Sequence, residues 1–383
     1  MTAISINGRD ARPGICDVAI VGGGLVGSAL AYGMRHQTRS IVVLDEGDVG
    51  FRASRGNFGL VWVQSKGLGM SAYARWTLAS SRLWPAFAAQ LREDSGIDVA
   101  LEQKGGLFPL LGEAETAARM RFMQRMHAQP DMPDYEWQLL DRHQAADLVP
   151  GLGPEVTGAV WSAADGTVNP LKLLLALHTV FPRIGVDYRP HHGVQDITQQ
   201  GGVFHLQTAQ GVVRAHKVVL ASGLCNELLG RQLGLHLPMA PQRGQILILE
   251  RTRKLQTLPF VTLRQTDEGT WLVGDSQEDA GYADDVVTLP VLATLADRAV
   301  RTLPALREVR VVRSWSALRV RAQDGFPVYE QSPTHPGAFI ATCHSGVTLA
   351  AAHAQTLAPM VATGALAPEL SCFSTQRFHV QKT

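Results

Sequence analysis

The chain has 383 residues, of which 45% are hydrophobic and 18% charged, a composition typical of globular proteins and unlike that of disordered chains. Its length exceeds what one compact α/β unit needs, so we expect two closely packed domains with a large core. A formal net charge of +1, with basic residues scattered along the chain, argues against an electrostatic nucleic-acid surface, and we expect no nucleic-acid partner.

Residues 17–46 predict a strand, a turn, a helix and a second strand. Gly22, Gly24 and Gly27 form the pattern G-x-G-x-x-G where the first strand gives way to the helix. The first glycine permits a tight turn, the second lets the backbone approach a pyrophosphate, and the third allows close packing of helix and strand. Asp45 ends the second strand at about the 20-residue offset at which an acid binds a ribose. The alternative is a glycine-rich turn without function, but the complete pattern favours a dinucleotide site.

Residues 47–63 mix glycines and small residues with Arg52, Ser54, Arg55 and Asn57. A loop of this composition after the ribose-binding strand lets the backbone approach a cofactor, although an ordinary surface loop is the alternative. Beyond it, periodicity predicts helices at 70–92 and 113–127, a strand pair at 102–111 and, at 131–154, a connection that contains one short helix.

A helix is expected directly after Asn169, with Pro170 at its first position, following an Asp-Gly turn at 165–166. We interpret its apolar run, residues 171–180, as core without chemistry. The remaining elements are an antiparallel ribbon at 193–198, 203–208 and 212–215, a buried strand at 218–221, a mostly antiparallel sheet between about 240 and 318 with a helix at 289–303, a strand at 338–342 and a long helix at 347–362.

The four cysteines, Cys16, Cys225, Cys343 and Cys372, lie far apart and lack C-x-x-C spacing. We therefore expect no zinc site, iron–sulfur cluster or other metal centre, and thiols in a reducing compartment. No apolar run has the length of a signal-peptide core or of a bilayer span, so we expect a cytoplasmic protein without a transmembrane segment.

Several segments, distributed over nearly the whole chain, together form the pattern of one family. They are VAIVGGGLVGSALAYGM and VVLDE, then ASRGNFGLV, DGTVNP, KVVLASGLCNELL and PQRGQILIL, and finally WSALRVRAQDGFPVYE with ATCHSGVTLA. In their order and spacing the chain resembles the FAD-dependent D-amino-acid oxidase superfamily, and within it the glycine and sarcosine oxidase branch.

The resemblance implies an α/β fold with two domains. One is a Rossmann-like FAD-binding domain of residues 1–90, 150–235 and 335–383, and the other is an α+β substrate domain of residues 91–149 and 236–334, built on a mostly antiparallel sheet. It also implies FAD as the cofactor and an enzyme that dehydrogenates the C–N bond of a small amino-acid or imino-acid substrate. Hydride passes from the substrate to the flavin, and the resulting imine hydrolyses.

The resemblance further implies which residues contact FAD. These are Gly22, Gly24, Leu25, Val26, Gly27, Asp45, Glu46, Arg52, Ala53, Ser54, Asn57, Phe58, Gly59, Leu60, Val194, Ala221, Ser222, Gly223, Ser345, Gly346, Val347 and Thr348. The last four are expected at the start of the final long helix, where free N–H groups stabilise the negative charge of reduced flavin.

The sequence departs from the family pattern at informative places. Cys343 replaces the glycine before the final histidine, and no cysteine lies near residues 318–320, where monomeric sarcosine oxidases attach FAD, so we expect non-covalent FAD. The run NFGLVWVQSKGLGMSAYARW, with the compact CHSGVTLA, is most similar to catalytic β subunits of multi-subunit opine and D-hydroxyproline dehydrogenases. That similarity implies partner subunits with further redox centres, with an FMN at a subunit interface as an option.

Three residues are expected at the substrate. Arg319 offers a fixed fork that matches a carboxylate bidentately, and its alternative is a structural ion pair. His344 either tunes the flavin or accepts a proton, with a satisfied turn histidine as the alternative, and Trp62 forms a wall of the site or ordinary core. Weaker candidates for side-chain specificity are Thr262, Arg264 and Gln277.

Several functional classes stay open at this point. The first is the catalytic subunit of an amine dehydrogenase complex with an opine, D-hydroxyproline, sarcosine or D-amino-acid type of substrate. The second is a stand-alone glycine or D-amino-acid oxidase that uses oxygen. The third is a flavin subunit that mainly serves assembly and electron relay. A purely NAD-dependent dehydrogenase fits less well, because it needs none of the other cofactor-facing segments.

Overall fold

The computed structural model describes residues 14–47, 52–274 and 276–379, and its largest sheet has eight strands. Six of them run in the order β17 (Val328–Gln331), β18 (Ala338–Thr342), β11 (Gly211–Leu220), β1 (Ile15–Val21), β2 (Ile41–Leu44) and β8 (Val186–Arg189). Neighbours from β18 to β8 are parallel, and β17 is an antiparallel edge strand. The predicted Rossmann-like arrangement is confirmed.

Strand β11 belongs to both the antiparallel and the parallel part of this sheet. Its first half pairs antiparallel with β10 (Val203–Thr208), which pairs with β9 (Val194–Gln200), and its second half lies parallel between β1 and β18. The sequence prediction separated 212–215 from 218–221, and this was wrong. No glycine or proline interrupts the run between them, so the chain continues as one ten-residue strand.

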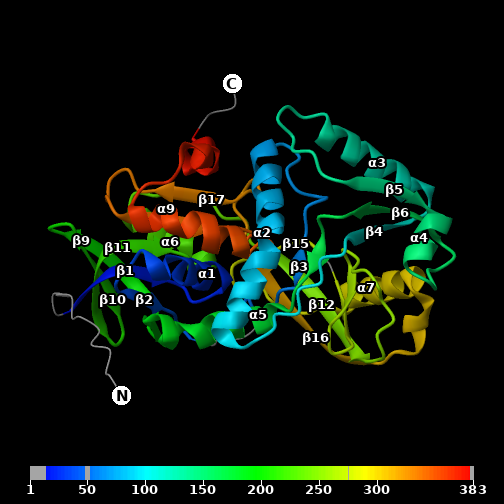
Figure 1. Ribbon diagram of the computed structural model, residues 1–383, viewed down its shortest axis with the longest axis horizontal. Helices are drawn as coiled ribbons and strands as arrows, with labels where there is room; N and C mark the ends of the chain where they lie inside the picture. Colours follow the sequence, from blue (N-terminus) through cyan, green and yellow to red (C-terminus); the bar gives the residue numbers. More distant parts are fainter. Residues whose placement is uncertain (1–13, 48–51, 275, 380–383) are drawn as a thin grey trace, which may run out of the picture.

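Helices cover both faces of the parallel sheet (Figure 1). They include α1 (Leu25–Gly33) and α6 (Asn226–Gln232), while α5 (Pro170–Val180) packs against α1. The start of α5 is as predicted, since Asn169 Oδ1 accepts hydrogen bonds from the N–H groups of Leu171 and Lys172, both at 3.2 Å. Short 3₁₀ turns lie at Met34–His36, Phe181–Ile184, Gly223–Cys225, Pro304–Glu308, Pro368–Phe373 and Thr375–Phe378.

A second region, on the right in Figure 1, contains antiparallel sheets, as predicted. Five strands form its larger sheet: β12 (Gln242–Arg251), β13 (Leu263–Gln265), β14 (Thr270–Val273), β15 (Glu278–Asp279) and β16 (Val311–Arg319). A smaller sheet and three helices pack around it: β4 (Gly106–Leu111), β5 (Trp137–Asp141), β6 (Val156–Ser162), α3 (Glu113–His127), α4 (Arg142–Leu148) and α7 (Leu289–Thr302). A two-stranded pair, β3 (Leu60–Val61) with β7 (Gly166–Thr167), lies near the centre.

Helix α2 (Ser71–Ser95) stands between the two regions (Figure 1). Pro85 lies inside it and has no N–H for the carbonyl of Ser81. Gln103, which lies outside the helix, donates hydrogen bonds from its Nε2 to Ser81 O at 2.9 Å and to Ser81 Oγ at 2.7 Å. The proline is thus accommodated in a helix whose Trp84 and Phe87 are fully buried.

Two predicted boundaries differ from the structure. Only β4 forms within 102–111, and Glu102 instead makes an isolated bridge with Thr167. The final helix begins at α8 (Ala350–Ala352), not at residue 347, and continues through a π-helical turn, His353–Leu357, into α9 (Ala358–Thr363).

Two strands pair with a sheet of the region to which the predicted domain boundaries did not assign them. Strand β6 was assigned to the FAD-binding domain but pairs with β4 and β5, and β17 was assigned to the substrate domain but pairs with β18. The boundaries themselves stay a prediction.

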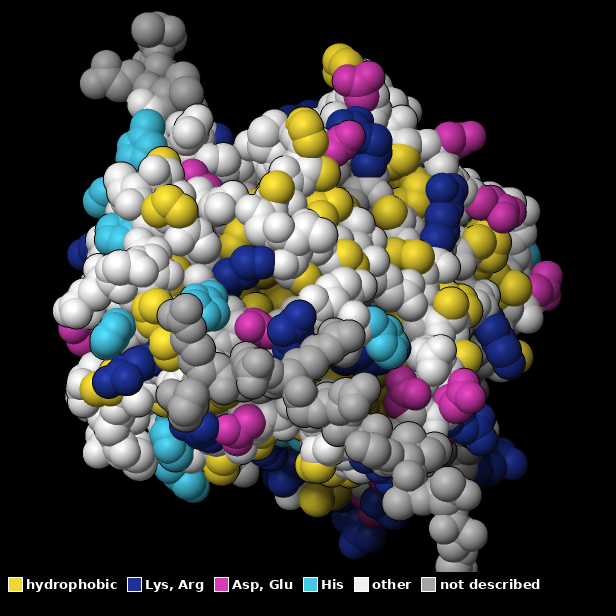
Figure 2. Space-filling model, turned by 60° about the vertical axis from the view of Figure 1, so that its left-hand side comes forward, with side chains coloured by type: hydrophobic (Ala, Val, Ile, Leu, Met, Phe, Trp, Pro, Cys, Tyr) yellow, Lys and Arg dark blue, Asp and Glu magenta, His cyan; other side chains and the backbone are white. Residues whose placement is uncertain are grey.

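Charged side chains of both signs are interspersed over the face seen in Figure 2. Within the described part of the chain, no helix is long and apolar enough to cross a membrane.

Candidate active site

One cavity of about 1070 Å³ lies where the two regions meet. Its walls come from the ends of β1 and β2, the start of α1, the loop at 52–60, the strands β12 and β16 and the turn at 342–348. All of the residues predicted to contact FAD line this cavity except Gly27 and Gly59, and so do the three main substrate candidates, Arg319, His344 and Trp62. The structure therefore brings segments from the whole length of the chain to one site.

The glycine-rich turn forms one end of the cavity. Gly22 has φ +107°, and a Cβ there would lie 2.4 Å from the carbonyl oxygen of Ala221. A Cβ on Gly24 would lie 2.7 Å from Ser54 Oγ. Gly27 lies behind the wall, where a Cβ would meet the Gly22 oxygen at 1.9 Å, so it serves helix–strand packing and does not line the site.

The loop at 52–60 is tied to the start of α1. Ser54 Oγ accepts a hydrogen bond from the Leu25 N–H at 2.9 Å, and Asn57 Oδ1 accepts one from the Gly59 N–H at 2.8 Å. Arg52 is exposed and pairs with Glu46 at the rim. Gly59, at φ +89°, does not line the cavity, and a Cβ there would lie 2.4 Å from the carbonyl oxygen of Val168.

Asp45 holds the turn through its carboxylate. Its Oδ2 accepts from the Gly23 N–H at 2.6 Å and its Oδ1 from the Gly47 N–H at 2.8 Å, while the carboxylate still lines the cavity.

Two residues near this turn, His178 and Tyr188, were not predicted from the sequence. His178 of α5 has its Nε2 2.9 Å from Gly23 O, and its ring is tilted by 35° to that of Tyr188 with the ring centroids 4.7 Å apart. Both residues line the cavity.

The apolar run around His178 concealed it, because the composition of 171–180 is that of core. Burial lowers the pKa of His178, so it is a neutral hydrogen-bonding group at this end of the cavity.

The turn at 345–348 is fixed by helix α2. Tyr73 Oη and Ser345 Oγ are 2.8 Å apart, and Ser80 Oγ donates to the carbonyl of Thr348 at 2.7 Å. Thr348 Oγ1 donates to Leu60 O at 3.1 Å and accepts from the Trp62 N–H at 3.2 Å. The turn, the loop after residue 52 and α2 therefore form one hydrogen-bonded unit.

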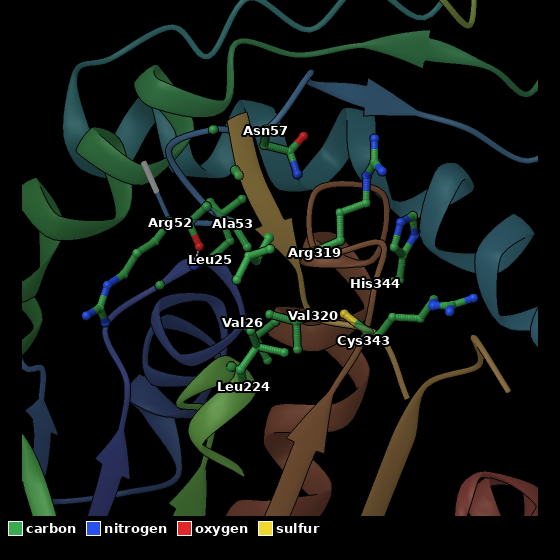
Figure 3. A pocket seen from close by; sticks show the side chains of 18 of the residues that line it. Leu25, Val26, Arg52, Ala53, Asn57, Leu224, Arg319, Val320, Cys343 and His344 are labelled. Carbon is green, nitrogen blue, oxygen red and sulfur yellow. Dashed lines mark hydrogen bonds between the residues drawn. The ribbon is translucent and has the colours of Figure 1, made fainter. Parts of the chain in front are cut away.

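Arg319 lies at the end of β16, opposite Gln242 of β12. Its Nη1 donates to Gln242 Oε1 and to Arg243 O, both at 3.3 Å. A Cβ on Gly244 would come within 2.4 Å of Arg319 Nη2, so the absence of a side chain there makes room for the guanidinium. Figure 3 shows Arg319 near His344, with Arg52 on the other side of the view.

His344 is surrounded by positive charge. Desolvation and the charges of Lys66, Arg319 and Arg321 hold its pKa well below the usual range. It is therefore neutral near pH 7. The neighbouring Cys343 is buried, which raises the pKa of its thiol to about 12.

Trp62 is 3% exposed and lines the cavity, yet among the described residues no acceptor binds its Nε1–H. Of the weaker candidates, Gln277 lines the cavity, whereas Thr262 and Arg264 do not. The sequence analysis missed other lining residues in this area, which are Ser65, Lys66, Phe108, Arg119, Phe122 and Val261.

A model of the family described as FAD dependent oxidoreductase (DAO) matches residues 17–360. The chain belongs to this family of FAD-dependent oxidoreductases. It is 44% identical to an opine oxidase subunit of Agrobacterium tumefaciens (strain Ach5) over 367 residues, 96% of this chain and 98% of that protein. It is 29% identical to glycine oxidase of Geobacillus kaustophilus (strain HTA426) over 375 residues, 96% and 98% of the two chains.

Structural similarity agrees with these matches. The crystal structure of glycine oxidase from Geobacillus kaustophilus superposes with a TM-score of 0.86 at 27% identity, over 94% of this chain and 98% of that chain. The predicted family, fold and FAD cofactor are confirmed.

The residues of this oxidoreductase also fit FAD physically. The backbone cradle at Gly22 and Gly24 has no room for side chains, as a pyrophosphate site requires. One continuous cavity joins that cradle to Arg319, and Trp62, whose buried Nε1–H has no acceptor among the described residues, lines it as well.

Proposed function

We propose that this FAD-dependent oxidoreductase dehydrogenates the C–N bond of a small amino acid with a secondary or primary amine, as the catalytic subunit of a dehydrogenase complex. The observation that carries the proposal is the single cavity that joins the pyrophosphate cradle to the cationic end at Arg319. The similarity to a protein named as an opine oxidase subunit supports a substrate of the opine type and the presence of partner subunits.

The residues at the cationic end suit an amino acid. Arg319, positioned by Gln242 and Gly244, binds the substrate carboxylate. The charges of Lys66, Arg319 and Arg321, which lower the pKa of His344, disfavour a further cation, so they favour the substrate with a neutral amine, whose proton passes to the solvent on binding. The amine then has the free lone pair from which C–N oxidation proceeds.

FAD, when bound, supplies the two-electron acceptor for the hydride that leaves the substrate carbon. The oxidised product is an imine, to which water adds to give a carbonyl compound and an amine. Trp62 and the turn at 345–348 enclose the reacting atoms and exclude water from them.

An anaerobic titration of the purified holoenzyme tests this function. The panel contains D-amino acids, N-alkyl amino acids and opines, and the readout is bleaching of the flavin absorption. We expect bleaching by a secondary-amine amino acid with slow reoxidation in air and fast reoxidation by an artificial acceptor. A flavin that no amine in the panel reduces would contradict the proposal.

A stand-alone oxidase is the second candidate, because the chain resembles glycine oxidase over almost its full length. In that case the isolated chain turns over in air and releases peroxide stoichiometrically. A subunit that mainly relays electrons would show reduction only when its partners are present. We also propose a cytoplasmic location, the predicted roles of the individual site residues, and the option of an FMN at a subunit interface.

A further inference from the structure

Arg119 of α3 is a buried cation on the wall of the cavity. Its side chain is 7% exposed, and its Nη2 donates to the backbone oxygen and Oε1 of Gln64 at 3.0 and 2.9 Å. The rings of Phe108 and Phe122 lie 4.2 and 5.0 Å from its Cζ. The guanidinium is thus held in one orientation by aromatic stacking and by the loop that follows Trp62.

The charge of Arg119 is not matched by a contacting acid. In the part of the chain that the structure describes, Arg119 forms no ion pair, and its Nε has no hydrogen-bond partner. The charge of Asp165 acts on it only from beyond Gln64, whose Nε2 donates to Asp165 Oδ2 at 2.7 Å. Burial lowers the pKa of Arg119 to about 10, which leaves it charged at neutral pH. A buried cation of this kind destabilises the fold unless an anion joins it.

Two further donors on the same wall lack partners. Trp62 Nε1 and Ser65 Oγ are buried, and neither has a hydrogen-bond partner among the described residues. Both residues line the cavity together with Arg119. A fixed guanidinium, together with unmatched donors on two other residues that line the same cavity, is suited to a carboxylate, which accepts several hydrogen bonds at once.

We propose that Arg119, Trp62 and Ser65 form a second anion subsite, which binds a second carboxylate of the substrate while Arg319 binds the carboxylate next to the amine. The substrate class is then an N-carboxyalkyl amino acid, a secondary amine that carries two carboxylates. Phe108 and Phe122 contact the methylene groups between them. This inference rests on the proposed function, because it assigns the remaining end of the same substrate.

Binding of unreactive ethers to the holoenzyme tests the subsite directly. Oxydiacetate and 3-(carboxymethoxy)propanoate carry two carboxylates, methoxyacetate carries one, and an ether oxygen replaces the amine so that no turnover occurs. Dissociation constants come from the change in flavin absorption on titration. We expect the wild-type enzyme to bind one of the dicarboxylates about tenfold or more tightly than methoxyacetate, as expected for one charge-assisted pair.

Two variants separate binding from structure. Arg119→Gln keeps a donor for the Gln64 carbonyl but removes the charge, so it should reduce the preference to about twofold or less with methoxyacetate binding unchanged. Arg119→Lys keeps the charge and should retain part of the preference. Parallel loss of affinity for all three ethers, with a lowered thermal midpoint, would make Arg119 a structural residue and overturn the inference.

The two proposals fail in different ways. Amines that bleach the flavin, without any wild-type preference for a second carboxylate, would overturn the subsite and leave the proposed function standing. Ethers that bind with the expected preference to an enzyme that no amine reduces would uphold the subsite and overturn the function.

Discussion

Gly244 provides a way to move Arg319 without changing its charge. A Cβ at Gly244 would lie 2.4 Å from Nη2 and 2.5 Å from Cζ of Arg319. These atoms are the far end of a flexible side chain, so in Gly244→Ala we expect the guanidinium to swing away while the backbone stays in place. Gly244 has no positive φ, and alanine therefore fits its extended conformation.

The magnitude follows from the interaction that is lost. A hydrogen bond to a charged group contributes about 1.5–3 kcal/mol. If Arg319 clamps the substrate carboxylate, Gly244→Ala should raise the apparent substrate dissociation constant by about 10- to 150-fold. Because the variant leaves the reacting atoms in place, the limiting rate of flavin reduction should change much less.

Anaerobic stopped-flow reduction at several substrate concentrations measures both quantities. Gly281→Ala is the matched control, since a Cβ there meets nothing within 4 Å and substrate binding should be unchanged. Flavin content and thermal midpoint should equal those of the wild type in both variants. An unchanged dissociation constant in Gly244→Ala, at full flavin content, would refute the clamp.

Four other outcomes are expected. Gly24→Val should purify without FAD, because its side chain enters the space of Ser54 Oγ and of the pyrophosphate, and full flavin occupancy would contradict the cradle. Acid precipitation of the wild type should leave all FAD in the supernatant, and flavin in the pellet would show a covalent link. Asn169→Ala should lower the free energy of unfolding by about 1 kcal/mol through loss of the α5 cap, measured by urea denaturation, with FAD retained. Burial lowers the pKa of His353 to about 3, below its unfolded value near 6.5, so the unfolded state binds more protons and His353 costs stability as the pH falls from about 6.5 towards 3. The stability gap between wild type and His353→Gln should therefore shrink by about 2 kcal/mol from pH 7 to pH 5, and a constant gap would refute the assignment.

Local patterns made part of the site predictable. The glycine turn and Asp45 belong to a short strand–helix–strand unit, whose geometry is set by residues close in sequence. The start of α5 was equally accessible, because Asn169 and Pro170 act within one helical turn. These features need no knowledge of distant parts of the chain.

Tertiary packing decided what the sequence did not reveal. The last helix starts late because α2 holds the preceding turn, through Ser80 and Trp84, both of which donate to the carbonyl of Thr348. Arg119 belongs to a well-charged amphipathic helix, where one more arginine gives no signal of burial. His178 was missed because its neighbours are apolar, so the run at 171–180 indicated core and gave no signal of a polar site.

The buried charge of Arg119 lowers the stability of the fold unless an anion binds beside it in the cavity. Evolution of a stable fold alone would favour an apolar side chain at position 119, because without a contacting acid the Gln64 hydrogen bonds and the aromatic rings offset only part of the desolvation penalty of the guanidinium. Asp165 could have served as that acid, but Gln64 stands between them and burial raises the pKa of Asp165 to about 7. The arrangement leaves the charge of Arg119 available to the cavity. Destabilising features of this kind concentrate at functional sites, which is why the unmatched cation identifies a ligand-binding position more strongly than the many ion-paired arginines on the surface.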